Sequence, residues 1–173
     1  LVRIRNTDGS IIPPNVFIPV AEDNGSIIQL GKIILEKVCR FLSESADSMP
    51  GIQYIEVNLS VVQAEDPELA TDVIKTIQKY NIPCDRINLE ITESASVKGK
   101  QQILSNMQTL LDKGIHFSLD DFGTGYSNIA SIMLMPIDFV KIDKSLLWSY
   151  ASGDNEFLNE LMPMIRGEGK KII

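Results

Sequence analysis

Cysteine and histidine are scarce in this sequence of 173 residues, which contains two Cys and one His. Cys39 and Cys84 lie far apart with no His cluster near them, so we expect neither a disulfide framework nor a zinc site. This use of cysteine is typical of a reducing compartment, and it predicts a cytoplasmic chain, whether or not the parent protein is anchored in a membrane.

Long hydrophobic runs are also absent. No apolar stretch approaches the roughly 18 to 20 residues that a membrane-spanning helix needs, so this segment should make no membrane contact. The first residues, LVRIR, form neither a signal peptide nor a start at Met.

Positive charge is the third shortage. The sequence has 16 Lys and Arg against 23 Asp and Glu, a formal net charge of −7 that disfavours binding of a DNA or RNA polymer. A small anionic ligand is still allowed if metal ions supply the positive charge. With 44% hydrophobic residues, the chain can bury one sizeable core, and a single domain is expected.

Strand-sized and helical patterns alternate along the chain. Four apolar, β-prone segments end in polar residues, at 55–60, 87–91, 116–121 and 139–143. The spacing of apolar residues predicts helices at 27–42, 67–80, 100–113 and 155–166. Asp66 is the expected N-cap of the second helix, Gly114 should end the third, and Pro163 should interrupt the fourth. A further strand is expected at 170–173.

This alternation is typical of a parallel α/β sheet, either open and doubly wound or closed into a (β/α) barrel. The periodicity does not choose between the two. In both, ligands bind at the carboxyl ends of the strands. Six polar residues should therefore gather at one edge, namely Asn58, Glu90, Asp120, Asp121, Lys141 and Asp143.

Oxygen ligands without His or Cys select hard cations, so Mg²⁺ or Mn²⁺ is expected at this edge. Two adjacent carboxylates, Asp120 and Asp121, suit a pair of metals roughly 3.5 to 4 Å apart. Neighbours within a strand point to opposite faces, so both can serve one site only where the strand is interrupted.

Each residue also has a structural interpretation. Asn58 could cap the following turn, and Asp120 with Asp121 could simply begin a Gly-rich turn. Glu90 could form a structural ion pair with Lys141. The functional interpretation is favoured because all the candidates fall at the same end of successive strands.

Five motifs occur in order over nearly the whole chain. They are FIPVAE at 17–22, VNLS at 57–60, LEITES at 89–94, LDDFGTGYS at 119–127 and VKIDKS at 140–145. Together they closely resemble the EAL-domain family of cyclic di-GMP phosphodiesterases. The resemblance implies a TIM-barrel-like (β/α)8 fold with an antiparallel first strand, and metal-dependent hydrolysis of cyclic di-GMP to linear pGpG in bacterial signalling.

The resemblance also implies roles for single residues. Asn58, Glu90 and Asp120 resemble metal ligands, and Asp121 would serve a second metal. Lys141 is similar to the family lysine that orients or polarises the attacking water, and Glu93 to the glutamate that holds the DDFG loop. Arg3 matches an arginine that approaches the ligand phosphate. Asp143, in the KID motif, is placed with the substrate-binding residues, with its exact role open.

The ends depart from the family pattern. Leu1 aligns with the leucine of Glu-Ala-Leu itself, and the family continues with Ala-Glu-Gly-Val-Glu after Ile173. We therefore expect residues 1–173 to be a single EAL-type phosphodiesterase domain that is incomplete at both ends and is weakly active or inactive by itself. A (β/α)8 barrel needs about 250 residues, which agrees with this expectation.

Two further expectations concern partners and the rival function. A homodimer is expected, with sensory or diguanylate cyclase domains fused in the parent protein. The alternative to an enzyme is a receptor module that binds cyclic di-GMP without cleaving it. The intact candidates Asn58, Glu90, Asp120, Asp121 and Lys141 favour the enzyme.

Overall fold

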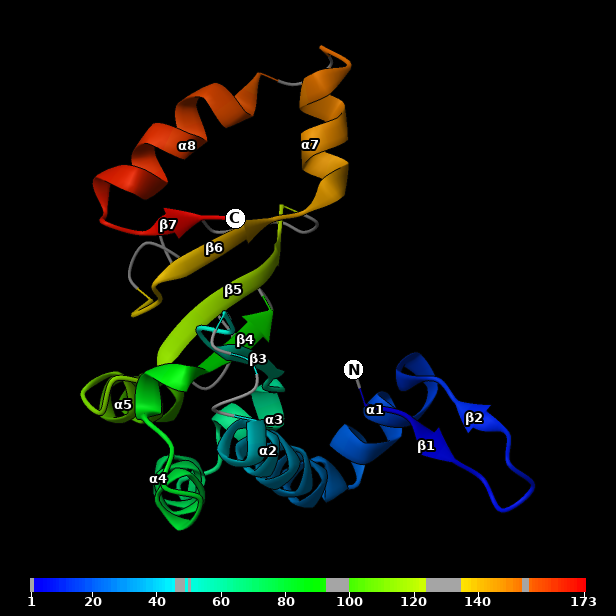
Figure 1. The fold of residues 1–173 in the computed structure, drawn as a ribbon. Helices are drawn as coiled ribbons and strands as arrows, with labels where there is room; N and C mark the ends of the chain where they lie inside the picture. Colours follow the sequence, from blue (N-terminus) through cyan, green and yellow to red (C-terminus); the bar gives the residue numbers. More distant parts are fainter. Residues whose placement is uncertain (1, 46–48, 50, 93–99, 124–134, 154–155) are drawn as a thin grey trace.

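A computed structural model of the chain describes residues 2–45, 49, 51–92, 100–123, 135–153 and 156–173 (Figure 1). Within these ranges, five strands form one parallel sheet in the order β3-β4-β5-β6-β7. They are β3 (Ile55–Asn58), β4 (Ile87–Thr92), β5 (His116–Phe122), β6 (Phe139–Ile142) and β7 (Lys171–Ile172).

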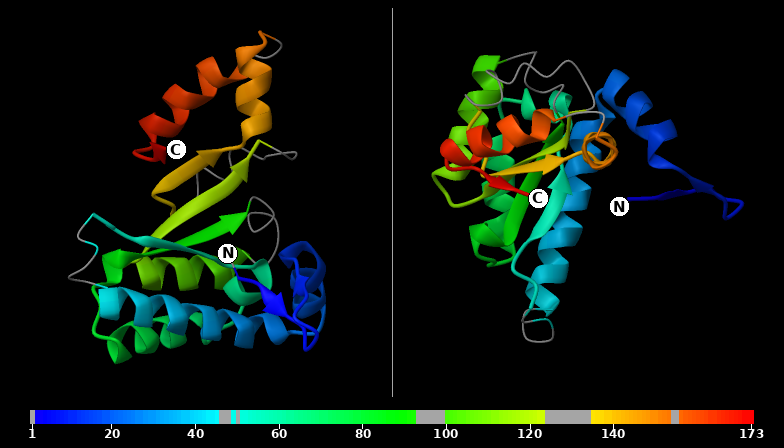
Figure 2. Two further views of the ribbon diagram at one scale, coloured as in Figure 1. Left: turned by 45° about the vertical axis from the view of Figure 1, so that its right-hand side comes forward. Right: turned by 90° about the horizontal axis from the view of Figure 1, so that it is seen from above.

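The strand order follows the chain without a reversal. A doubly wound sheet has a point where the order reverses, and its ligand binds there. Because the described strands show no such point, the sheet has the winding of a barrel rather than of an open doubly wound fold. The sheet is also strongly twisted (Figures 1 and 2).

Three helices lie side by side along β3, β4 and β5 (Figures 1 and 2). They are α2 (Ser26–Ser45), α4 (Leu69–Lys79) and α5 (Lys100–Leu111). Two further helices, α7 (Lys144–Ala151) and α8 (Phe157–Gly167), lie beyond β6 and β7. The short α3 (Val61–Ala64) and a 3₁₀ turn (Cys84–Arg86) complete the connections around β3 and β4.

The N-terminal segment forms a small unit beside the sheet. Strands β1 (Ile4–Arg5) and β2 (Ile11–Ile12) pair antiparallel with each other, and α1 (Pro14–Asp23) follows and contacts α2. In Figure 1 the hairpin lies away from the five-stranded sheet. The antiparallel first strand of the barrel stays a prediction.

The core lies between the sheet and the helices. Val57, Leu89 and Phe117 are aligned across β3, β4 and β5 by the strand register and are buried. Ile77 of α4 and Leu110 of α5 are buried against them in one cluster. Successive side chains of a strand point to opposite faces, so these buried residues form one apolar face of the sheet, which the helices cover.

Most expected elements lie within a few residues of those observed, and two details were wrong. The helix expected from residue 67 begins at Leu69, because Asp66 closes a turn by accepting a hydrogen bond from the backbone N–H of Glu68 at 3.0 Å. Pro163 lies inside α8 and does not interrupt it. The Gly114 prediction is confirmed, since this residue has φ +89° and its N–H bonds Leu111 O at 2.8 Å.

In the part of the chain that the structure describes, no helix combines the length and apolar character needed to cross a membrane. The sequence did not predict α7, α1 or the N-terminal hairpin. Each is short, and α7 follows directly on the candidate site residue Asp143.

Candidate functional site

The second face of the sheet is polar. The register pairs Glu56 with Asn88, Asn58 with Glu90, and Thr92 with Asp120. Side chains alternate between faces along a strand, so these residues share the face opposite to Val57 and Leu89. We call this surface the polar face. Its polar side chains include those of Glu56, Asn58, Asn88, Glu90, Thr92, Ser118, Asp120 and Lys141.

Asn58 and Glu90 are in direct contact. The Asn58 Nδ2 atom donates to Glu90 Oε2 at 3.2 Å, and the backbone N–H of Leu59 bonds Glu90 O at 2.7 Å. Asn58 is the last residue of β3, so its side chain lies at the carboxyl end of the strand. The sequence prediction that these two residues come together is confirmed.

A capping box fixes the chain directly after Asn58. Ser60 caps α3 by accepting a hydrogen bond from the N–H of Gln63, whose side chain accepts in return from the N–H of Ser60. The Gln63 side chain lies against Gly31 of α2, where an added Cβ would fall 1.8 Å from Gln63 Nε2. Glycine at position 31 therefore lets α2 approach the turn that carries Asn58.

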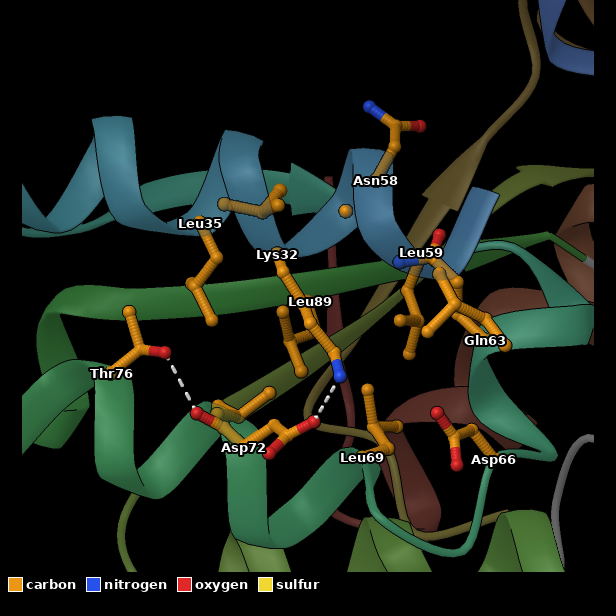
Figure 3. A pocket seen from close by; sticks show the side chains of 14 residues that line it. Lys32, Leu35, Asn58, Leu59, Gln63, Asp66, Leu69, Asp72, Thr76 and Leu89 are labelled. Carbon is orange, nitrogen blue, oxygen red and sulfur yellow. Dashed lines mark hydrogen bonds and ion pairs between the residues drawn. The ribbon is translucent and has the colours of Figure 1, made fainter. Parts of the chain in front are cut away.

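A cavity of about 40 Å³ lies behind this turn, between α2, β3 and α4 (Figure 3). Lys32 and Asp72 form an ion pair across it at 2.6 Å, and Leu35, Leu69 and other apolar side chains line the rest. Figure 3 shows the amide of Asn58 pointing away from this cavity. The cavity thus belongs to the packing behind the polar face and not to the site itself.

Lys141 links two carboxylates on the polar face. Its Nζ atom donates to Glu56 Oε2 at 2.6 Å and contacts Glu90 Oε1 closely. Burial lowers the pKa of Lys141, but the hydrogen bonds to Glu56 and Glu90 outweigh it, and the pKa lies above its ordinary value. The ion pair that the sequence offered as a structural role for Glu90 is therefore present.

Sequence reasoning missed Glu56. The signal was available, because Glu56 lies two residues before Asn58 and so shares its face of the strand. Sequence reasoning also missed its neighbours Asn88 and Ser118, which lie two residues before Glu90 and Asp120 and so share their faces. Asn88 is fully buried and donates to Ser118 Oγ at 2.6 Å and to Glu56 Oε1 at 3.3 Å.

Negative charge accumulates around Glu90. Burial raises the pKa of its carboxyl group, Lys141 opposes the shift, and the nearby charges of Glu56 and Asp120 raise the pKa further. Glu90 is 8% exposed. A carboxylate in this setting is stabilised by additional positive charge.

Asp120 and Asp121 lie at an irregularity of β5. The register with β6 shifts between Leu119 and Phe122, and Asp121 has φ +53°, a left-handed conformation that residues other than glycine seldom adopt. Burial raises the pKa of Asp121, as do the charges of Asp120 and Asp143. The interruption needed for both carboxylates to reach one site is therefore present in the strand.

The other candidates are placed less directly. Asp143 caps α7 by accepting hydrogen bonds from the backbone N–H of Ser145, at 2.7 Å, and from its hydroxyl, and these bonds lower the pKa of Asp143. Arg3 is exposed and donates to the neighbouring Val2 O at 2.9 Å. Substrate binding by Asp143 and Arg3 stays a prediction. Glu93 lies outside the described residues.

The polar face fits a hard divalent cation in its chemistry. Its donors at the strand ends are carboxylate and carboxamide oxygens. Burial, together with neighbouring carboxylates, raises the pKa values of Glu90 and Asp121, and added positive charge would stabilise their charged forms. Within the described ranges, no three His, Cys, Asp or Glu side chains already form a cation cage. Glu90 is engaged by Lys141, so a cation would have to take over part of this contact.

Comparison with known proteins identifies the family. The EAL domain family matches residues 1–173. This chain belongs to the EAL-domain family. The TIM-barrel-like fold expected from its motifs is confirmed by the solved EAL structures that it resembles.

Two curated relatives of this EAL chain illustrate the similarity. The cyclic di-GMP phosphodiesterase PdeR of Escherichia coli is 33% identical over 144 residues, which cover 83% of this chain and 22% of PdeR. The bifunctional diguanylate cyclase/cyclic di-GMP phosphodiesterase MucR of Pseudomonas aeruginosa is 29% identical over 175 residues, which cover 100% of this chain and 26% of MucR. The EAL chain thus spans about a quarter or less of each relative.

One solved structure shows a similar chain with a bound ligand. The PaMucR phosphodiesterase in its c-di-GMP complex has a TM-score of 0.87 and 29% identity, and the alignment covers 99% of this EAL chain and 70% of that chain. The EAL domain of FimX from Pseudomonas aeruginosa has a TM-score of 0.86 at 19% identity, which bears on the fold alone.

Proposed function

We propose that the full-length protein to which this EAL chain, residues 1–173, belongs hydrolyses cyclic di-GMP to linear pGpG with Mg²⁺ or Mn²⁺ as cofactor. One observation carries the proposal: on the polar face, Glu90 of β4 contacts both Asn58 of β3 and Lys141 of β6. Membership of the EAL family, the activity named for PdeR and the c-di-GMP complex of the MucR phosphodiesterase support it.

The residues divide into those that hold cations and those that act around them. Asn58, Glu90 and Asp120 would hold one cation, and Asp121 would contribute to a second. Bound divalent cations would activate a water molecule and neutralise charge that develops on the phosphate. The high pKa of Lys141 keeps its ammonium group charged, so it can orient the water or the phosphate by donating hydrogen bonds.

The reaction balances as a hydrolysis. A water oxygen bonds to phosphorus in one phosphodiester, the bond between phosphorus and the 3′ oxygen breaks, and a proton from water ends on that oxygen. The product is a linear dinucleotide with one 5′-phosphate. Glu93 is proposed to hold the DDFG loop at 120–123, and Arg3 is proposed to approach the ligand phosphate.

The test is turnover of cyclic di-GMP by the full-length protein with Mg²⁺, followed by chromatography of the nucleotides. We expect pGpG from the native protein and a loss of at least about a hundredfold in rate for Asp120→Asn, which removes one anionic cation ligand. Glu65→Gln, at an exposed carboxylate after α3, is the matched control and should leave the rate unchanged. Equal rates for native protein and Asp120→Asn would overturn the role of that residue.

A receptor that only binds the nucleotide is the rival outcome of the same experiment. Tight binding of cyclic di-GMP by the native protein, measured by calorimetry with Mg²⁺ present, without any pGpG would overturn the proposed hydrolysis.

The proposal extends to the protein's surroundings. The exposed apolar side chains Leu147 and Trp148 of α7, the latter 67% exposed, support a homodimer. MucR, which combines two catalytic activities in one chain, supports fused signalling domains here. A cytoplasmic location agrees with a nucleotide substrate.

A further inference from the structure

Glu56 is the carboxylate on the polar face to which the proposed reaction assigns no role. It accepts a hydrogen bond from Lys141 Nζ at 2.6 Å, between residues 85 apart in the sequence. The side chains are largely shielded, with Lys141 20% and Glu56 29% exposed. An ion pair that is partly removed from water holds its geometry better than one on an open surface.

The buried side-chain amide of Asn88 fixes the position of Glu56. Asn88 donates one N–H to Glu56 Oε1 and the other to Ser118 Oγ, and it is fully buried. The carboxylate can only accept, so the amide must present its nitrogen to Glu56. Glu56 is thus fixed from two sides, by Asn88 and by Lys141.

Glu56 and Glu90 differ in their distance from the strand ends. Glu56 lies two residues before Asn58, which places it ~6.6 Å deeper along β3. Glu90 pairs with Asn58 in the register and is in contact with it. A cation held at the strand ends therefore competes with Lys141 for Glu90, but not for Glu56.

We propose that Glu56 is a positioning residue that keeps the ammonium group of Lys141 at the cation site when a divalent cation takes the carboxylate of Glu90. This inference rests on the proposed function. Without Glu56, Lys141 would depend on Glu90 alone and would either block the cation or be repelled by it. With Glu56, Lys141 keeps a counter-charge and can act on the water or the phosphate.

The experiment compares four forms of the full-length protein: native, Glu56→Gln, Lys141→Ala and the double variant. Rates are measured on cyclic di-GMP with Mg²⁺, and the affinity for Mn²⁺ alone is measured by calorimetry. We expect Glu56→Gln to lower kcat about tenfold with little change in KM, because positioning and not nucleotide binding is lost. We also expect its Kd for Mn²⁺ to rise about fivefold, since Lys141 then competes fully for Glu90.

Both effects should vanish in the Lys141→Ala background, where Glu56→Gln has no ammonium group to release. If Glu56 instead bound the cation directly, or acted only through its negative charge, Glu56→Gln would still weaken Mn²⁺ binding in the Lys141→Ala background. This result would overturn the inference. So would a Glu56→Gln variant with native kcat and native Mn²⁺ affinity. Glu65→Gln controls for the loss of a carboxylate, and thermal unfolding followed by circular dichroism checks that each variant folds.

The two proposals fail separately. A native protein that binds Mn²⁺ but forms no pGpG contradicts the proposed hydrolysis, and the Mn²⁺ cycle still decides the role of Glu56. A native protein that forms pGpG, with additive effects of the two substitutions, contradicts the positioning role alone.

Discussion

The two faces of the five-stranded sheet differ in chemistry: one is apolar and packs against helices, and the other is the polar face. On one face Val57, Leu89 and Phe117 are buried against helices. On the other, Glu56 and Glu90 contact Lys141, and Asn58 contacts Glu90. Residues of the two groups are neighbours in the chain and differ only in the side to which the strand directs them. Substitutions on the apolar face should therefore cost stability, whereas substitutions on the polar face should cost activity.

The largest effect on stability is expected for Phe117→Ala. Phe117 is fully buried in β5, and its truncation leaves a cavity and removes apolar contacts, which should lower the free energy of unfolding by about 3 to 5 kcal/mol. Urea unfolding followed by circular dichroism measures it. A decrease in the free energy of unfolding of less than about 1 kcal/mol would contradict tight packing of the helices against this face.

Glu90→Gln should show the opposite behaviour. The rate on cyclic di-GMP should fall at least about a hundredfold, because an anionic ligand is lost at the proposed cation site. The free energy of unfolding should change by less than about 1 kcal/mol, since Lys141 keeps Glu56 and the new amide still offers an oxygen. Steady-state kinetics and urea unfolding test both halves, and a variant as unstable as Phe117→Ala would contradict the division between the faces.

Gly31→Ala tests the contact between helix α2 and the turn that follows Asn58. The new methyl group would displace the Gln63 side chain and break the capping box behind Asn58, at a cost of about 1 kcal/mol in thermal unfolding. Gly167→Ala in α8 is the matched control, because a methyl group there meets no atom within 4 Å. The control should keep or slightly raise stability. Equal destabilisation by both changes would contradict the close contact between Gly31 and the Gln63 side chain.

The smallest effect concerns pH in the absence of metal. Burial, with Glu56 and Asp120, raises the pKa of Glu90 above its ordinary value of 4.5, against the influence of Lys141. The folded chain then binds this proton more tightly than the unfolded chain, so the contribution favours folding below pH 4.5 and is lost as the pH rises through the raised pKa.

Glu90→Gln removes this titration. The stability of the variant relative to the native chain should therefore increase from about pH 4.5 upward. Urea unfolding in metal-free buffers at several pH values measures the trend. A difference that is flat with pH, or that falls, would contradict the raised pKa.

The sequence predicted most of the sheet because apolar runs ending at Asn58, Glu90 and Lys141 are local patterns. Barrel winding could not be read from these patterns, since strand order depends on how distant segments pair. The contact between Lys141 and Glu56 is equally non-local, as the two residues are 85 apart in the sequence. Asp143 shows the converse: a motif residue expected at the ligand also has a local task, the cap of α7.

The most direct test of the central claim is the product of cyclic di-GMP in the presence and absence of Mg²⁺, measured by chromatography for the full-length protein and its Glu90→Gln variant. We expect pGpG only from the native protein and only with a divalent cation. Metal-independent formation of pGpG, or equal formation by the variant, would contradict the assignment of the polar face as the site of reaction.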